Sequence, residues 1–286
     1  MSSHQSSQQS SILDQASSFR KKEALSVPAI PVIATLAQRE LVRFFRQRNR
    51  VMGALGQPVL FWWLFSAGLQ PSGLGYAHFF PGILAMILLF TAIFTTISII
   101  EDRREGFLQS VLVSPAPQWA MVLGKILGGA AIAMLQGLLF LLLGGMTLGL
   151  TSSSGDLVMA ILMMGLLSVS LTGLGFLIAW RMNSTQGFHA IMSLFLFPMW
   201  LLSGAFFPQG GQGLLAWVVA VNPLTYGVAG LRNYLQFGDA PEDLVQETLS
   251  QGPSMFLCWM VSIGFALAML TMSWRISGTR TTGDLL

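Results

Sequence analysis

Six apolar runs, each long enough to cross a lipid bilayer, constrain the fold of this chain more than any other feature of its sequence. They are expected at residues 51–69, 79–100, 119–150, 157–180, 188–207 and 255–274. About 20 helical residues suffice to cross the hydrocarbon, where the backbone groups of an open chain are satisfied only by a helix. Only 9% of the 286 residues are charged, against roughly 25% in soluble domains. The sequence therefore predicts an all-α integral membrane protein with six transmembrane helices.

The basic residues predict which side of the membrane each loop faces. If both chain ends and the loops after the second and fourth spans share one side, that side holds all but Arg232 of the 15 Lys and Arg residues. Loops rich in Lys and Arg face the cytoplasm. We therefore expect a multi-pass protein of the cell (inner, or cytoplasmic) membrane with both termini in the cytoplasm. Because these basic residues flank apolar runs, they indicate a lipid bilayer and not a nucleic acid as the partner.

Polar segments flank the membrane domain, which is expected to cover residues 31–275. Residues 1–30 begin with a Ser- and Gln-rich stretch without the apolar core of a signal peptide, which predicts a disordered cytoplasmic tail. Residues 276–286 predict a second cytoplasmic tail. Residues 32–50 carry arginines at three- and four-residue steps, namely Arg39, Arg43, Arg46 and Arg50. This stripe predicts an amphipathic helix in the membrane interface; a soluble helix is the alternative.

A shorter apolar stretch before the last span predicts a pair of re-entrant helices over residues 208–236. Residues 214–221 are too few to cross the membrane. Asn222 suits a helix N-cap and Pro223 suits the first helical position after it. An ordinary extracellular loop is the alternative.

A charged segment follows the second span and cannot lie in hydrocarbon. Its five consecutive ionisable residues are Glu101, Asp102, Arg103, Arg104 and Glu105. A helix-compatible stretch continues to Ser114 and is followed by Pro115. A short helix over residues 101–114 on the water side is a surface on which a soluble partner can dock. A solvated helix with local ion pairs is the alternative.

Several chemistries have no sequence signature here. The chain lacks the G-x-x-x-x-G-K-[ST] loop that holds ATP, and Cys258, its single cysteine, excludes a disulfide framework. The three histidines are far apart and give no metal-ligand spacing: His4, His78 and His189. The predicted spans contain no carboxylate, whereas ion-coupled transporters usually need one in the membrane. We therefore predict no catalytic, cofactor-binding or metal-binding residue in this chain.

Two features of the third span concern its packing. Lys125 lies near the start of the span, and its long side chain is expected to extend to the cytoplasmic interface. Gly124 and Gly128 form a G-x-x-x-G step, which lets two helices approach closely. The step fits packing within one subunit as well as packing between two copies.

Two blocks of sequence resemble a known family. The first has Glu101, Glu105, Gly106, Phe107 and Leu108, then Ser114-Pro115 and Leu123-Gly124-Lys125. The second comprises residues 202–208, 221–227 and 231–232. Together they resemble the permease subunit of bacterial ABC-type-2 exporters, in the branch of drug and lipo-oligosaccharide exporters.

The resemblance implies a six-span permease that forms a dimer, with an identical or a sister permease, and pairs with two copies of a separate ABC ATP-binding subunit. ATP and Mg would be bound by that partner. The residues implied in ATPase docking are Glu101, Arg104, Glu105, Gly106, Phe107 and Leu108, with Arg43 and Arg46 on the interfacial helix. The residues implied in the re-entrant region are Gly204, Phe207, Pro208, Asn222, Pro223, Tyr226 and Arg232.

The expected function is ATP-driven export of an amphipathic, lipid-linked or drug-like molecule, with no catalysis by this chain. The route is expected to pass between two copies, along the first, second and fifth spans. Aromatic candidates for its lining are Trp62, Trp63, Phe90, Phe94, Phe195 and Trp200; each also fits a lipid-facing or packing role. Two other functions stay open: a passive channel or scaffold, and a lipid- or glycan-modifying enzyme using Glu101, Asp102, Arg103 and Glu105.

Overall fold

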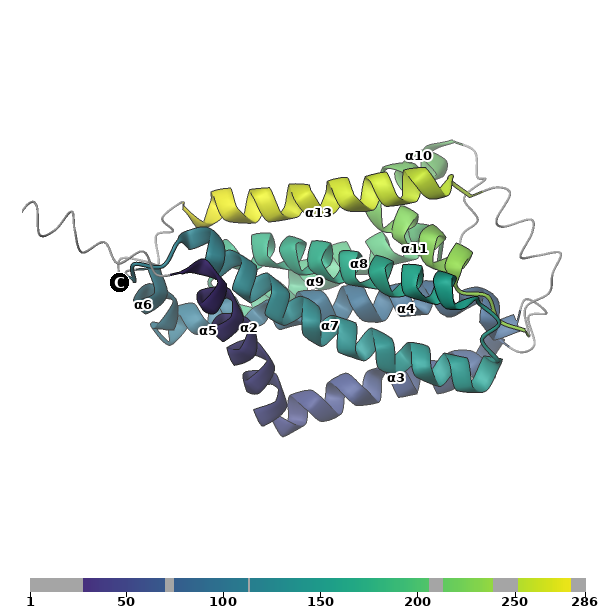
Figure 1. Ribbon diagram of the computed structural model, residues 1–286, viewed down its shortest axis with the longest axis horizontal. Helices are drawn as coiled ribbons and strands as arrows, with labels where there is room; N and C mark the ends of the chain where they lie inside the picture. Colours follow the sequence, from purple (N-terminus) through teal and green to yellow (C-terminus); the bar gives the residue numbers. More distant parts are fainter. Residues whose placement is uncertain (1–27, 70–74, 113, 206–212, 239–251, 279–286) are drawn as a thin grey trace, which may run out of the picture.

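The computed structural model describes residues 28–69, 75–112, 114–205, 213–238 and 252–278, and these residues are almost entirely helical (Figure 1). The helices in the first half are α2 (Ala29–Arg46), α3 (Arg48–Leu69), α4 (Gly75–Thr95), α5 (Ile97–Arg104) and α6 (Phe107–Leu112). The second half has α7 (Gln118–Leu148), α8 (Ser154–Trp180), α9 (Thr185–Trp200), a π-helical turn (Leu201–Ala205), α10 (Leu214–Val221), α11 (Pro223–Tyr234) and α13 (Met255–Ser277). Leu150 and Phe237 form an isolated β-bridge.

Five helical segments within the described residues are long and apolar enough to cross a membrane. They are Ala77–Arg104, Gln118–Leu148, Ser154–Trp180, Thr185–Ala205 and Met255–Ser277. These segments confirm the all-α membrane fold. Helix α3 has 22 residues, enough for a crossing, but falls outside this apolar set. The count of six spans therefore remains a prediction.

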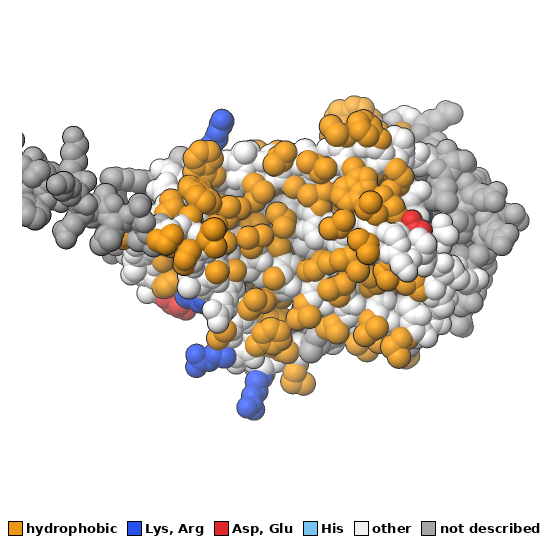
Figure 2. All heavy atoms as spheres, in the orientation of Figure 1, with side chains coloured by type: hydrophobic (Ala, Val, Ile, Leu, Met, Phe, Trp, Pro, Cys, Tyr) orange, Lys and Arg blue, Asp and Glu red, His pale blue; other side chains and the backbone are white. Residues whose placement is uncertain are grey.

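Helix α4 forms the centre of the bundle. Its side chains at Ile83, Leu84 and Leu88 are completely buried, and α7 and α8 pack along it. Helix α13 lies along one edge and α3 along the other, while α2 runs across the end of the bundle that holds α5 and α6 (Figure 1). Hydrophobic side chains cover the middle of the face in Figure 2, and most of its Lys and Arg side chains lie toward the α2 end. This distribution fits a protein surrounded by lipid.

The sequence predicted that the second span ends at residue 100. In the structure the helical segment continues as α5 through Arg104. Gly106 then turns the chain with a φ of 75°, which favours glycine because it lacks a Cβ. Helix α6 begins only at Phe107. The prediction of one short helix over residues 101–114 is therefore wrong in its start: the charged residues end the span, and α6 follows the turn.

The interfacial helix predicted at residues 32–50 is two helices, since α2 ends at Arg46 and α3 begins at Arg48. Helix α2 packs tightly on α7 at the G-x-x-x-G step. A Cβ added to Gly124 would lie 2.8 Å from the Cβ of Leu36, and one added to Gly128 would lie 2.8 Å from the Cβ of Glu40. The two glycines therefore serve packing within this subunit.

This contact gives a prediction that separates packing from helix propensity. Gly128→Ala should lower the free energy of unfolding by about 1–3 kcal/mol, because the added methyl group overpacks the α2–α7 contact. Gly165→Ala on α8 is the matched control, since a Cβ there meets no atom within 4 Å. The control should be neutral or stabilising by up to about 1 kcal/mol, as alanine favours the helix. Thermal unfolding in detergent measures both, and equal shifts would contradict this packing.

The opposite end of the bundle carries the predicted re-entrant helices. The Asn222 side chain accepts a hydrogen bond from the amide of Leu224, and Pro223 opens α11, which confirms the predicted cap. Helix α11 ends at Tyr234, two residues before the predicted end at residue 236. The predicted tail over residues 1–30 and the predicted site residues Phe207 and Pro208 lie outside the described residues, apart from residues 28–30.

Candidate functional site

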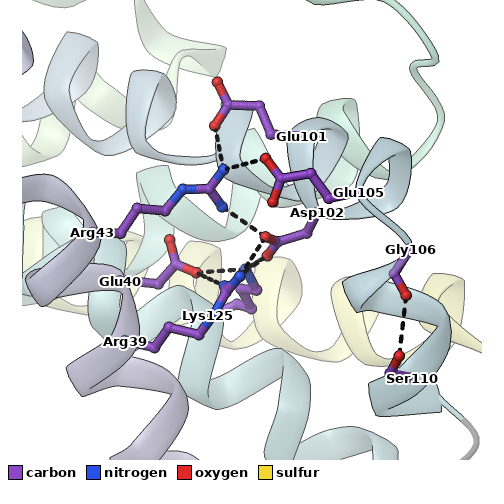
Figure 3. Close-up of polar contacts among 9 residues, drawn as sticks. All are labelled: Arg39, Glu40, Arg43, Glu101, Asp102, Glu105, Gly106, Ser110 and Lys125. Carbon is purple, nitrogen blue, oxygen red and sulfur yellow. Dashed lines mark hydrogen bonds and ion pairs between the residues drawn. The ribbon is translucent and has the colours of Figure 1, made fainter. Parts of the chain in front are cut away.

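Charged side chains from three helices converge beside the turn that precedes α6 (Figure 3). Helix α2 contributes three of them, α5 and the residue after it contribute three, and α7 contributes one. We call this set the charged cluster; it comprises Arg39, Glu40, Arg43, Glu101, Asp102, Glu105 and Lys125.

Asp102 lies at the centre of the charged cluster and its side chain is completely buried. It accepts hydrogen bonds from both Nη atoms of Arg39, at 3.1 and 2.9 Å, and from Nη1 of Arg43 at 2.6 Å. The Lys125 ammonium also binds it. A buried carboxylate is costly unless cations and donors compensate it. Asp102 therefore joins α2, α5 and α7 through three cations.

The sequence predicted that the Lys125 side chain extends to the cytoplasmic interface. In the structure this side chain is buried against Glu40 and Asp102. Its Nζ lies 2.5 Å from Oε1 of Glu40, and its side chain is 3% exposed. The close packing of α2 on α7 at Gly128 places Glu40 over the lysine. Sequence reasoning missed Glu40, although its register gave a signal: it falls on the buried face of α2 with Leu36 and Phe44, four residues to either side.

The outer part of the charged cluster ties α2 to the start of α6. Arg43 Nη2 lies 2.8 Å from Glu101 and 3.4 Å from Glu105. The Arg39 guanidinium stacks 3.6 Å above the centre of the Phe107 ring, a favourable cation–π arrangement. Burial opposes the charge of Arg39, yet its hydrogen bond and ion pair with Asp102 outweigh burial and raise its pKa above the ordinary value. Arg39 is therefore cationic at any physiological pH.

Arg103 and Arg104, which follow Asp102 on α5, bind the opposite side of the bundle. Arg103 donates to the carbonyl oxygen of Trp180 at 2.6 Å and to that of Met182 at 3.2 Å. Arg104 donates to the carbonyl oxygen of Asn183 at 2.9 Å. A cation at the last carbonyls of a helix also meets the negative end of its dipole. Helix α5 is thus held to α2 and α7 on one side and to the α8–α9 connection on the other.

The predicted docking residues divide by exposure. Arg46, Arg104 and Glu105 are exposed, whereas Leu108 is 2% exposed and holds α6 against the bundle. Arg43 is directed into the charged cluster, with a 16% exposed side chain. The hydroxyl of Ser110 donates to the carbonyl oxygen of Gly106 (Figure 3), and this residue is exposed on α6. An ATPase contact at these residues remains a prediction.

The predicted path residues do not share one environment. Trp63 and Phe195 are exposed. Phe90 and Phe94 are half-buried, and their stacked rings have centroids 6.1 Å apart. Trp200 is buried, and its Nε1 donates to the carbonyl oxygen of Gly82 at 2.8 Å. Trp200 therefore serves packing between α9 and α4 in this conformation. The Trp62 side chain lies outside the described part of the chain.

The region predicted to be re-entrant is held by hydrogen bonds from side chains to backbone oxygens. Arg232 donates to Gly204 at 3.2 Å, and the Tyr226 hydroxyl donates to Ala220 at 2.8 Å. Gly204 has a φ of 77°, a conformation that favours glycine. Burial lowers the pKa of Arg232 to about 10, so it stays cationic at neutral pH.

No group of three or more His, Cys, Asp or Glu side chains that could hold a metal ion occurs among the described residues. The carboxylates of the charged cluster are instead bound by Arg and Lys, as described above.

Comparison with known proteins gives relatives among membrane permeases. The chain is 27% identical over 174 residues to the "Probable multidrug ABC transporter permease YbhR" of Escherichia coli strains K12 and O157:H7. This match covers 59% of the chain but 46% of the relative, so the chain spans about half the length of these proteins. It is 23% identical over 214 residues to the "Putative transport permease ycf38" of Cyanophora paradoxa, covering 71% of the chain and 73% of the relative.

A family model places these similarities in one domain. It matches residues 31–235, which is more than half of the chain and includes the charged cluster, α6, α10 and α11. The chain is a multi-pass membrane protein and a transporter permease, not a member of an enzyme family. By this match it belongs to the ABC-2 type transporter family.

Proposed function

We propose that this permease is the membrane subunit of an ATP-driven exporter, with ATP hydrolysed by a separate partner. The single observation that carries the proposal is the placement of α5: four consecutive charged residues join the turn before α6 to α2 and α7 on one side and to the α8–α9 connection on the other. A partner that moves α6 would therefore move several membrane helices together.

The exposed residues around α6 form the proposed docking surface, which we define as Arg104, Glu105 and Ser110. Phe107 and Leu108 are the proposed anchors beneath it, because one is stacked on Arg39 and the other is buried. The interfacial helix α2 would move with this surface through Arg39 and Arg43. Such rigid-body transmission needs shape and fixed contacts, not catalytic groups.

The proposed assembly has two permease copies, identical or sister, and two ATPase subunits, located in the cytoplasmic membrane with both permease termini in the cytoplasm. Substrate would pass between the permeases. The word "multidrug" in the name of the Escherichia coli relatives supports an amphipathic or drug-like substrate. The lipo-oligosaccharide branch remains the other proposal for the cargo.

A lipid- or glycan-modifying enzyme is less well supported. Carboxylates do converge from several helices in the charged cluster, as an enzyme site would require, but Glu40, Glu101 and Asp102 are bound by Lys125, Arg43 and Arg39. A passive channel would differ from the exporter in one measurable property: it would move substrate without nucleotide.

The test is reconstitution of the chain with a P-loop ATPase, which is first sought in the reading frames adjacent to the gene of the permease. The proposal expects a stable complex, ATP hydrolysis that depends on the permease, and substrate movement that stops without ATP. Movement that continues at the same rate without nucleotide would favour the channel, and failure of the two proteins to associate would remove the proposal.

A further inference from the structure

A cavity of about 490 Å³ lies beside the charged cluster, between α2, α3, α4, α5, α7 and α9. This volume is within the range of small-molecule sites, about 300–1,000 Å³. Its lining includes Glu40, Arg43, Thr91, Phe94, Glu101 and Gln136. The cavity combines an apolar and aromatic wall with a charged rim, as an amphipathic ligand requires.

The wall of the cavity offers two aromatic rings and one neutral polar site. The centroids of the Phe94 and His189 rings lie 5.7 Å apart, and the ring planes are tilted by 45° to each other. Thr91 and Gln136 are buried and share a hydrogen bond of 2.5 Å between the hydroxyl and the amide oxygen. A buried polar pair in an apolar wall orients a ligand more than it attracts one.

The charged rim favours a cation. The charged cluster holds three cations, Arg39, Arg43 and Lys125, against four carboxylates. Two of these carboxylates, Glu40 and Glu101, line the cavity. Glu40 binds Arg39 and Lys125 through Oε1, and its Oε2 has no hydrogen bond to any residue that the structure describes (Figure 3). The Glu101 side chain is 32% exposed.

An anion would meet poorer chemistry. Arg43 is the one cation among the described lining residues, and it is already shared between Glu101, Asp102 and Glu105. An anionic ligand that bound Arg43 would compete with these three carboxylates for its guanidinium. A ligand cation instead compensates the surplus carboxylate and faces the aromatic rings, which also attract cations.

We propose that this cavity binds an amphipathic organic cation, with its charge near Glu101 and Glu40 and its apolar body against Phe94. The proposal deepens the proposed function, on which it rests, by assigning a charge to the transported molecule and a place where it first binds. The site lies at the same charged cluster that joins α2 to α5, so occupancy would be felt by the helices that hold α6.

The test uses two probes of nearly the same size and shape but opposite charge, tetraphenylphosphonium and tetraphenylborate. Each is titrated into the purified chain in a neutral detergent, without ATPase, and equilibrium binding is measured after subtraction of detergent blanks. We expect saturable binding of the cation only. Glu101→Gln should weaken it about tenfold, or about 1.4 kcal/mol, because it removes a carboxylate that faces the bound cation. Phe94→Leu, which keeps an apolar side chain but removes the ring, should weaken it several-fold.

Asp156→Asn is the matched control, because it removes one carboxylate from the start of α8, far from the cavity lining. It should bind the cation as the parent chain does. Equal binding of both ions, no saturable binding of the cation, or full binding by both Glu101→Gln and Phe94→Leu would overturn the inference. These outcomes leave the proposed function intact if the ATPase still associates and hydrolyses ATP in a permease-dependent way, so the two failures are distinguishable.

Discussion

Asp102→Asn is expected to lower the free energy of unfolding by about 3–5 kcal/mol, the usual cost of removing one partner from a buried ion pair. Asparagine keeps the shape of the side chain but removes the charge that compensates Arg39, Arg43 and Lys125. Three cations would then compete for the remaining carboxylates. Thermal or denaturant unfolding of the purified chain in detergent measures this loss.

The matched control is Glu105→Gln, which removes a carboxylate from the exposed edge of the same cluster. The Glu105 side chain is 60% exposed and lies 3.4 Å from Arg43, so its loss should cost at most about 1 kcal/mol. Combining Asp102→Asn with Lys125→Met should recover part of the stability, because the unpaired buried ammonium is removed. An Asp102→Asn variant as stable as the control would show that the charged cluster does not hold α2, α5 and α7 together.

Glu105→Arg is expected to reduce the affinity of the permease for its ATPase at least about tenfold while leaving the fold intact. The residue is exposed beside the Gly106 turn, and Arg43 retains Glu101 and Asp102 as partners. A reversed charge in a complementary interface replaces attraction with repulsion, which costs several kcal/mol in favourable cases. Pull-down of the ATPase, together with the unfolding temperature of the permease alone, separates docking from stability.

Asp156→Arg carries the same change of charge at the opposite end of the bundle, at the start of α8 (Figure 1). It should bind the ATPase as the parent chain does. If Glu105→Arg and Asp156→Arg bind equally well, the surface around α6 is not where the partner docks.

Much of the fold was predictable because a bilayer leaves few choices. Apolar runs of sufficient length must form helices, and the structure has helices at every run that the sequence indicated. Local chemistry was equally readable at Asn222 and Pro223, since capping depends on neighbours in the chain. The fold class and the helices at α10 and α11 followed from these two principles.

The charged cluster was not predictable to the same extent, because it depends on which helices meet. The sequence places Glu40, Asp102 and Lys125 far apart, and only the α2–α7 contact at Gly128 brings the first of them over the last. Read alone, Lys125 is near enough to a span end to reach water. The end of the second helical segment was also missed. Hydropathy placed it at residue 100, whereas the segment continues through Arg104, with Glu101 to Arg104 bound to neighbouring helices and to the α8–α9 connection.

The most direct measurement for the central claim is site-directed cross-linking between the permease and its ATPase. A Cys258→Ala background removes the native thiol, which is buried; Ser110→Cys then places one reactive group on the exposed face of α6. We predict that this position cross-links to the ATPase, at a yield that changes between the nucleotide-free and the ATP-bound partner, and that Asp156→Cys gives no cross-link. If Asp156→Cys cross-links to the ATPase and Ser110→Cys does not, docking of the ATPase at α6 is contradicted.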